Sequence, residues 1–164
     1  MTRGGAWESE DRMQYKSPLL VVKDLQRSLE FYQKVLGLRK TADFGVNVTL
    51  TGGMSLQTEE SWLDFIGRKP SDLTYGGSAS ELYFEAEDYD AFLKELEGAE
   101  LVHPPLEHRW GQRAVRLYDP DRHVIEVAEP LTAVARRFQD AGLTEEGIAK
   151  RMDMPPEMIR RLLK

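Results

Sequence analysis

The feature that most constrains the fold of this chain is an order of predicted elements that occurs twice. Residues 18–22 form an apolar run typical of a buried strand, and residues 25–36 place apolar side chains on one helical face. Strands at 45–50 and 54–58 follow. The order returns in the second half as strand 81–86, helix 89–96, and strands 100–103, 114–118 and 124–127. The order is repeated but the residues are not, so we predict two related modules, each a strand, a helix and three strands, in an α+β fold.

Residues at the ends of both predicted helices support this assignment. Asp24 and Asp88 stand at N-cap positions, where a carboxylate accepts hydrogen bonds from free backbone N–H groups. Gly37 and Gly98 follow the two helices, and glycine commonly ends a helix in the left-handed conformation. Residues 119–122 contain Asp and Pro and are typical of a tight turn between the last two strands.

Alternation along the strands predicts a polar surface on one side of the sheets. Leu82 and Phe84 suit the side that the helix covers, so Glu81 and Tyr83 point the opposite way. The same alternation collects six side chains on the open side: Gln57, Glu81, Tyr83, Arg116, Tyr118 and Glu126. Because each helix covers only one face of its sheet, we expect the open faces to form a concave, polar-lined pocket for a small molecule.

Three segments lie outside the repeated order. Residues 1–14 are polar and read as a flexible leader, and residues 59–80 read as a linker with one short helix around Trp62, Phe65 and Ile66. Residues 131–164 are expected to add three helices at 131–141, 144–152 and 155–163. The last two resemble a helix-turn-helix. A packing extension that closes the pocket or supports a dimer is the preferred interpretation of this segment.

Composition narrows the classes of function. The chain has 164 residues, no cysteine and a net charge of −6, which excludes disulfides and zinc–thiolate sites and argues against a nucleic-acid partner. Residues 131–164 hold 7 Lys and Arg against 5 Asp and Glu, so the extension is basic but only weakly so. No apolar run approaches the ~20 residues that span a bilayer, and no signal peptide is apparent. A cytoplasmic protein without a membrane partner is therefore expected.

Two segments of this sequence resemble a known family. The run VKDLQRSLEFYQKVLGL at residues 22–38 is similar to the first strand-to-helix segment of the vicinal-oxygen-chelate superfamily, and DPDRHVIEV at 119–127 is similar to its closing "DPDG…IEL" hairpin. The segments at 55–58, 81–84 and 110–113 resemble an uncharacterised, glyoxalase-like bacterial subgroup. The resemblance implies the paired βαβββ fold of glyoxalase and bleomycin-resistance proteins. It assigns the domain to residues 15–130, with modules at about 15–58 and 80–130, followed by the helical extension.

The resemblance also implies where a metal would bind in metal-dependent members. The four ligand positions of the family fall on Ser17, on Ser55 or Gln57, on Glu81 and on Glu126. Only Glu81 and Glu126 hold metal-binding side chains, and none of the positions holds the histidine that nickel or zinc favours. No cofactor is therefore predicted, and a divalent metal at these two carboxylates stays open as the alternative.

Each candidate residue has a functional and a structural interpretation. Glu81 and Glu126 are candidate catalytic carboxylates, or they form a structural ion pair with Arg116. Arg116 would otherwise anchor an anionic ligand. Trp110 is a candidate aromatic wall or a core residue, while His103 and His108 are candidate acid–base groups or ordinary loop residues. Six residues are predicted to bind the ligand: Gln57, Tyr83, Trp110, Gln112, Arg116 and Tyr118.

Three hypotheses for function follow. In the preferred one, the chain binds a small organic molecule in the concave sheet pocket, as resistance members of the superfamily do. In the second it is a lyase or isomerase that uses Glu81 and Glu126, with or without a divalent metal. In the third it is a ligand-sensing regulator that binds DNA through its C-terminal helices. Members of this fold commonly dimerise, so a homodimer is expected.

Overall fold

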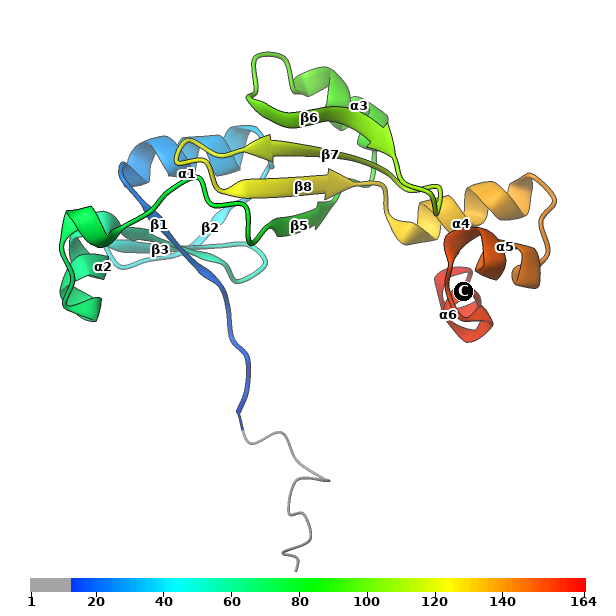
Figure 1. Ribbon diagram of the computed structural model, residues 1–164, viewed down its shortest axis with the longest axis horizontal. Coiled ribbons are helices and arrows are strands. Elements are labelled where there is room, and N and C mark those ends of the chain that lie inside the picture. The colour runs from blue at the N-terminus through cyan, green and yellow to red at the C-terminus, as the bar shows by residue number, and fades with distance from the viewer. Residues whose placement is uncertain (1–12) are drawn as a thin grey trace, which may run out of the picture.

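The computed structural model describes residues 13–164 and contains two four-stranded sheets, each with one parallel and two antiparallel pairings (Figure 1). The first module comprises β1 (Leu19–Val22), α1 (Leu25–Lys34), β2 (Lys40–Asp43), β3 (Asn47–Leu50) and β4 (Ser55–Thr58). The second comprises β5 (Leu82–Glu85), α3 (Tyr89–Glu95), β6 (Leu101–Glu107), β7 (Arg113–Tyr118) and β8 (Val124–Ala128). Their strand orders, β1-β4-β3-β2 and β5-β8-β7-β6, are equivalent. The predicted pair of βαβββ modules is therefore confirmed.

The two module helices begin at the residues expected. The Asp24 side chain accepts a hydrogen bond from Arg27 N at 2.9 Å, and Asp88 accepts one from Ala91 N at 2.9 Å. Each carboxylate satisfies a backbone N–H that has no partner within its helix. Helix α1 ends earlier than the predicted residue 36, although Gly37 does adopt the left-handed conformation.

Three elements differ from the sequence prediction. Strand β2 was not located, because Lys40–Asp43 is a mostly exposed, polar edge strand with no apolar alternation. Strand β6 continues past residue 103 to Glu107 and includes Pro104 and Pro105. Proline is tolerated there because β6 is an edge strand, and its pairing with β7 is irregular at these positions. The linker helix α2 (Glu59–Ile66) begins directly after β4, and a 3-10 turn, η1 (Pro70–Asp72), follows it.

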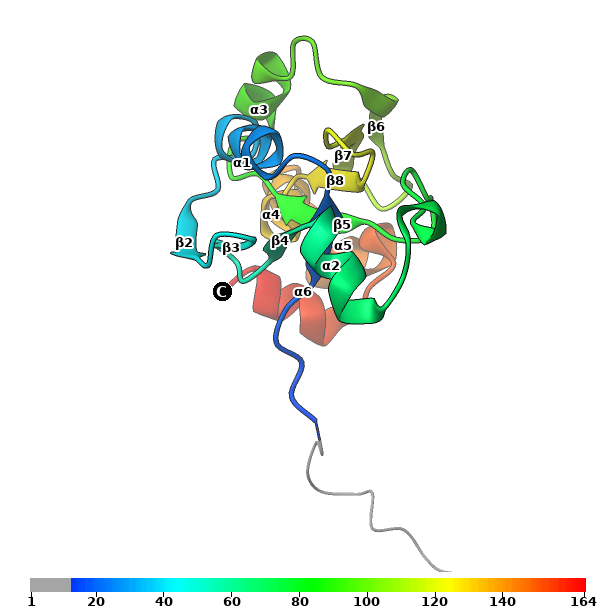
Figure 2. The same ribbon diagram turned by 90° about the vertical axis from the view of Figure 1, so that its left-hand side faces the viewer.

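The two modules share one hydrophobic core. Buried residues of both sheets, among them Leu56, Leu117 and Ile125, pack in a single cluster with side chains of α1 and α3. The two helices lie next to each other in Figure 2. The β7–β8 turn also contacts α1: Tyr32 donates to Asp119 Oδ2 at 2.8 Å, and Arg27 donates to Asp121 Oδ1 at 3.1 Å. The "DPD" motif therefore joins the second module to the helix of the first.

The C-terminal extension folds around a core of its own. Helices α4 (Leu131–Asp140), α5 (Glu145–Met152) and α6 (Pro156–Leu162) bury a separate cluster that includes Val134, Ile148 and Ile159. The predicted helical extension is present, and it lies at the end of the second sheet (Figure 1). Most of the predicted leader falls outside the described residues. Within residues 13–164, no helix is long and apolar enough to cross a membrane.

Candidate functional site

The centre of the candidate site is Arg116, which lies between two carboxylates on the open face of the second sheet. Arg116 Nε donates to Glu81 Oε2 at 2.7 Å, and its Nη2 donates to Glu126 Oε2. The sheet register produces this grouping, because Arg116 on β7 is paired with Glu126 on β8, and Glu126 is paired with Tyr83 on β5. The ion-pair interpretation made for these residues from the sequence is what the distances show.

The two carboxylates differ in their proton affinity. Burial, together with the neighbouring Glu81 carboxylate, raises the pKa of Glu126 to about 7, because only 5% of Glu126 is exposed and a second negative charge lies close to it. The hydrogen bond from Arg116 lowers the pKa of the more exposed Glu81. The bond to Glu81 is also the main reason why the pKa of Arg116 is raised. Of the two carboxylates, Glu126 is therefore the one poised to exchange a proton near neutral pH.

Two histidines approach this cluster from β6 and the loop after it. His103 Nε2 lies 3.4 Å from Arg116 Nη1, and His108 Nε2 lies 4.0 Å from Glu126 Oε1. The His108 Nε2 atom is buried without a hydrogen-bond partner. Burial, with the positive charge of Arg116, lowers the pKa of His108, so this ring is neutral at pH 7. Both histidines therefore lie beside the Arg116 cluster, and their acid–base role stays a prediction.

Trp110 and Gln112 connect the histidines to Tyr83. The rings of His108 and Trp110 are stacked, with centroids 4.3 Å apart and planes 7° from parallel. Trp110 Nε1 donates to Gln112 Oε1 at 2.9 Å, and Gln112 Nε2 donates to the Tyr83 hydroxyl at 2.9 Å. Tyr83 donates in turn to Glu85 Oε1 at 3.0 Å. These bonds form one continuous network from the open sheet face to the helical extension, since Trp110 also packs against the extension core.

Gln57 lies apart from this network. Its amide oxygen accepts a hydrogen bond from Asn47 Nδ2 at 2.7 Å, and its amide nitrogen donates to Ser61 Oγ at the start of α2. The residue is 2% exposed. We expected Gln57 to contact the ligand because a buried amide needs partners, but α2 and β3 supply those partners. The structure therefore groups seven of the eight candidate residues in the second module and leaves Gln57 in the first.

A cavity of about 360 Å³ opens beside Glu81 and Arg116. Tyr118 forms part of its wall. The guanidinium carbon of Arg122 lies 4.1 Å from the centroid of the Tyr118 ring. Five lining residues were not singled out in the sequence, namely Ser78, Ala79, Ser80, Val102 and Val124. All five are small or apolar residues in a linker or a strand, which carry no signal of chemistry in a sequence.

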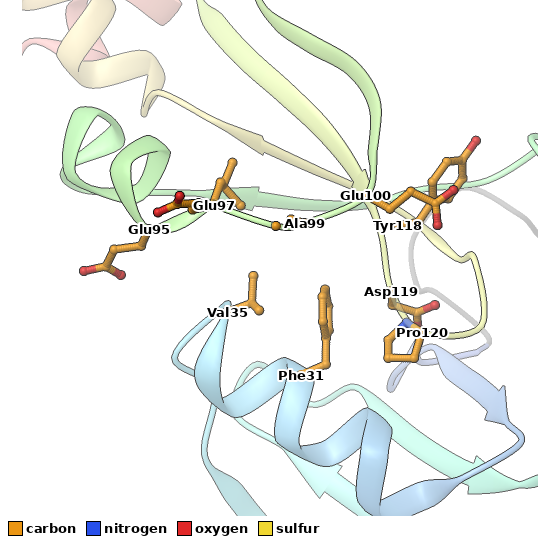
Figure 3. Close-up of a pocket in the computed structure, with 11 residues that line it drawn as sticks. Phe31, Val35, Glu95, Glu97, Ala99, Glu100, Tyr118, Asp119 and Pro120 are labelled. Carbon is orange, nitrogen blue, oxygen red and sulfur yellow. The ribbon is translucent and has the colours of Figure 1, made fainter.

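A second cavity, of about 340 Å³, lies between α1 and the α3–β6 connection (Figure 3). Phe31 and Val35 of α1 point toward Ala99 across it, and Glu95, Glu97 and Glu100 lie around its edge. This cavity is on the helix side of the sheets, and none of the candidate residues except Tyr118 lines it. It is therefore a separate feature of the packing between the modules.

The residues present do not fit the metal site of the family. Among residues 13–164, no three His, Asp or Glu side chains are arranged to hold a metal ion. The two carboxylates that retain the family positions, Glu81 and Glu126, are both hydrogen-bonded to the Arg116 guanidinium. A cation is already bound where a metal would need these oxygens, so no step of a reaction is assigned to a metal here.

The helical extension docks on the loop that carries His108, Trp110 and Gln112. Arg137 of α4 donates to Gly111 O at 2.7 Å and to the buried Glu129 carboxylate at 3.1 Å. Glu129 also accepts two hydrogen bonds from Arg113, from its backbone N at 3.0 Å and from Nη2 at 2.9 Å. Hydrogen bonds from Arg113 hold the pKa of Glu129 below its usual range even though burial opposes ionisation. No pattern in the sequence predicts this ion-pair cluster, since Glu129 lies 16 residues from Arg113 and 8 residues from Arg137 and these spacings follow no motif.

Comparison with known proteins gives matches that cover the two modules. The sequence matches the glyoxalase-like domain family over residues 15–132, so the match ends at the start of α4. A protein of unknown function from Agrobacterium tumefaciens is similar in structure, with a TM-score of 0.68 and 38% identity over 74% of this chain and 97% of that chain. No curated protein matches the sequence.

More distant solved structures resemble the chain in fold. A glyoxalase/bleomycin resistance protein/dioxygenase from Nocardioides has a TM-score of 0.61 and 20% identity, over 74% of this chain and 86% of that chain. A glyoxalase/bleomycin resistance protein/dioxygenase family enzyme from Burkholderia phytofirmans PsJN has a TM-score of 0.60 and 20% identity, over 70% and 96%. At this identity the likeness concerns the fold alone.

Proposed function

The chain belongs to the glyoxalase-like domain family, and on that premise we propose that it binds a small organic molecule against the open face of its second sheet. The resemblance to the vicinal-oxygen-chelate superfamily drawn from the sequence is confirmed by the same comparisons. The observation that carries the proposal is the cavity of about 360 Å³ beside Glu81, Arg116 and Tyr118. Cavities of roughly 300–1,000 Å³ with a few convergent polar groups are typical of small-molecule sites.

The groups around the cavity favour a ligand that combines an unsaturated ring with hydrogen-bonding groups. Tyr118 supplies an aromatic wall, while Val102 and Val124 supply apolar surface. Arg116 and Glu81 supply a donor and an acceptor at the same wall. Because the Arg116 charge is already balanced by two carboxylates, the site is not built to neutralise a strongly anionic ligand.

A second candidate function is acid–base catalysis by Glu126 in a lyase or isomerase reaction. The observation that favours it is the pKa of Glu126, which burial and Glu81 raise to about 7. General acid–base catalysis is most efficient when the pKa of the catalytic group is close to the working pH. Under this hypothesis, Glu126→Gln would abolish turnover of a bound ligand and leave its affinity nearly unchanged.

Ligand binding is tested by screening a library of small organic molecules for thermal stabilisation and measuring the affinity of the hits by calorimetry. Two exposed residues allow matched blocking variants, because Ser80 lines the sheet-side cavity and Glu97 lines the helix-side cavity. We expect Ser80→Trp to weaken the hits at least ~10-fold, equivalent to about 1.4 kcal/mol, and Glu97→Trp to leave them unchanged.

Two results would contradict the proposed site. Hits that bind the Ser80→Trp variant as well as the unmodified chain would place binding elsewhere. Hits weakened only by Glu97→Trp would move the ligand site to the helix-side cavity. Incubating each hit with the protein and analysing it by mass spectrometry separates the two candidate functions, since only catalysis changes the mass or the isomer of the ligand.

A further inference from the structure

Four side chains with metal-binding atoms surround the Arg116 guanidinium. Glu81 and Glu126 accept hydrogen bonds from it, and His103 Nε2 lies 3.4 Å from its Nη1. His108 completes the group, because its Nε2 lies 4.0 Å from Glu126 Oε1 and has no hydrogen-bond partner. Glu81 directly precedes β5 and Glu126 lies on β8, whereas His103 lies on β6 and His108 in the loop that follows it. Carboxylates and imidazoles are ligand types that zinc and nickel accept, although with the guanidinium in place no three such side chains of residues 13–164 are arranged to hold an ion.

We propose that Arg116 is the built-in cation of this site and stands in the place of a divalent metal. The guanidinium satisfies both carboxylates and places a positive charge where a divalent ion would need the same oxygens. The side chain is held in this position from both sides, by Glu81 at 2.7 Å and by Glu126. In this arrangement the site excludes a metal ion, and binding of an organic ligand needs no metal.

A variant that lacks the Arg116 guanidinium is expected to bind a divalent metal ion. Removing the Arg116 side chain leaves the Glu81 and Glu126 carboxylates without their cation, next to the unpartnered His108 Nε2 and the His103 ring. A divalent ion would restore the charge balance, since leaving the buried Glu126 carboxylate unpaired is costly. The Arg116→Ala variant should therefore gain a metal site that the unmodified chain lacks.

Arg113 provides a matched control on the same strand. Its guanidinium also lies between two carboxylates, Asp90 Oδ1 at 2.8 Å and Glu129 Oε1 at 2.9 Å. No histidine contact is found for Arg113 among the described residues. Arg113→Ala removes this partner from Asp90 and leaves Glu129 with Arg137, at a place without imidazoles, and nickel and zinc favour sites that contain imidazole. Metal binding that appears in Arg116→Ala and not in Arg113→Ala would therefore not follow from the loss of an arginine alone.

The test is calorimetric titration of Ni²⁺ and Zn²⁺ into chelator-treated protein. We expect no saturable binding to the unmodified chain or to Arg113→Ala, and one ion per chain for Arg116→Ala, at least ~100-fold tighter. Adding Glu126→Gln or His103→Ala to Arg116→Ala should remove the gain. Circular dichroism checks that each variant is folded, and Arg116→Gln replaces Arg116→Ala if the alanine variant unfolds.

Two outcomes would overturn the proposal. Saturable binding of either ion to the unmodified chain that is lost in Glu126→Gln would show that Arg116 does not occupy the metal position. A folded Arg116→Ala or Arg116→Gln variant that binds no more tightly than Arg113→Ala would show that these four side chains do not converge on the cation. Both results leave the proposed binding of an organic ligand standing, because that binding is measured separately with the ligand hits.

Discussion

Glu126 is the residue at which burial and charge act most strongly against each other. Its carboxylate is almost fully buried, one oxygen is bonded to Arg116, and the other faces the neutral His108 ring at 4.0 Å. Arg116 lowers the pKa of Glu126, but burial and the second carboxylate raise it by more, so the pKa lies at about 7. One proton shared by two carboxylates near neutral pH is a property of the whole cluster.

Glu81→Gln should lower the pKa of Glu126, because the substitution removes the negative charge that opposes its ionisation. A raised carboxyl pKa stabilises the folded state fully below the unfolded pKa of about 4.5, and this contribution is lost as the pH rises through about 7. In Glu81→Gln the loss should therefore be smaller and should be complete at a lower pH. Carboxyl ¹³C chemical shifts followed from pH 4 to 9 give the titration midpoint of Glu126 directly, and a change in pKa of roughly 0.5 can be resolved.

The opposite change provides the control for that titration. Arg116→Gln should move the midpoint of Glu126 upward, because Arg116 lowers its pKa. If the titration midpoint of Glu126 moves in neither variant, Glu126 is not electrostatically coupled to Glu81 and Arg116.

Residue-scale prediction succeeded where strand alternation alone fixes the side of the sheet. Glu81, Tyr83, Arg116 and Glu126 were placed on one face from the sequence, and the register of β5, β8 and β7 brings them together. Alternation does not reveal which neighbour a side chain bonds to. Gln57 lies on the predicted face of β4 but bonds to Asn47 and Ser61, a contact that depends on where α2 begins.

At the scale of elements, the loop between β6 and β7 contacts both the site network and the helical extension. His108, Trp110 and Gln112 take part in the site network, while Gly111 and Trp110 contact the helical extension. Gly111 has a φ of +86°, and its Cα lies so close to Phe138 of α4 that an added Cβ would be 2.4 Å from Phe138 Cζ. A side chain at this position would push the extension away from the loop.

Gly111→Ala should therefore destabilise the docking of the extension by about 2–4 kcal/mol, of which about 1 kcal/mol is backbone strain and the remainder overpacking. Gly142→Ala is the matched control, because Gly142 has a similar φ of +90° with nothing within 4 Å of an added Cβ. Urea unfolding gives the free-energy change, and hydrogen exchange should increase in α4–α6 more than in the sheets. Equal losses in the two variants would show that strain alone, and not contact with Phe138, is responsible.

Elements were predictable from the sequence where an apolar pattern accompanied them. Helix α1 has a capping Asp24 and a clear apolar face, and it was located to within two residues at its C-terminal end. Strands β2 and β6 are edge strands. An edge strand buries few of its side chains, so its sequence need not contain an apolar pattern. Lys40–Asp43 and the segment around Pro104 therefore look like loops in the sequence, although backbone pairing makes them strands.

At the scale of the whole molecule, the two modules are held together by a common apolar core and by the carboxylates of the β7–β8 turn. Asp119 accepts hydrogen bonds from Tyr32 OH of α1 at 2.8 Å, from His123 N at 2.8 Å and from Asp121 N at 2.9 Å. Asp121 accepts further bonds from Lys23 N and from Arg27. The resemblance identified this turn as a sequence motif, but nothing in the sequence showed that it contacts the helix of the other module.

Asp119→Asn should weaken this junction and reduce the acid sensitivity of the fold. Burial opposes ionisation of Asp119, but the hydrogen bonds from His123 and Tyr32 hold its pKa below the usual range. A lowered pKa contributes stability that is present above the unfolded pKa of about 3.9 and is lost as the pH falls through the folded value.

At pH 7 we expect Asp119→Asn to lose about 1–3 kcal/mol of unfolding free energy, since an amide cannot accept all of these bonds. The gap to the unmodified chain should narrow as the pH falls below about 3.9 and close below the lowered folded pKa of Asp119, where the carboxyl carries a proton. Urea unfolding of both proteins from pH 3 to 7 measures this. Asp43→Asn is the control, because Asp43 is exposed and its side chain, within residues 13–164, bonds to Lys40 and Gly45 of its own hairpin. A constant gap between Asp119→Asn and the unmodified chain down to pH 3 would mean that the charge of Asp119 does not join the modules.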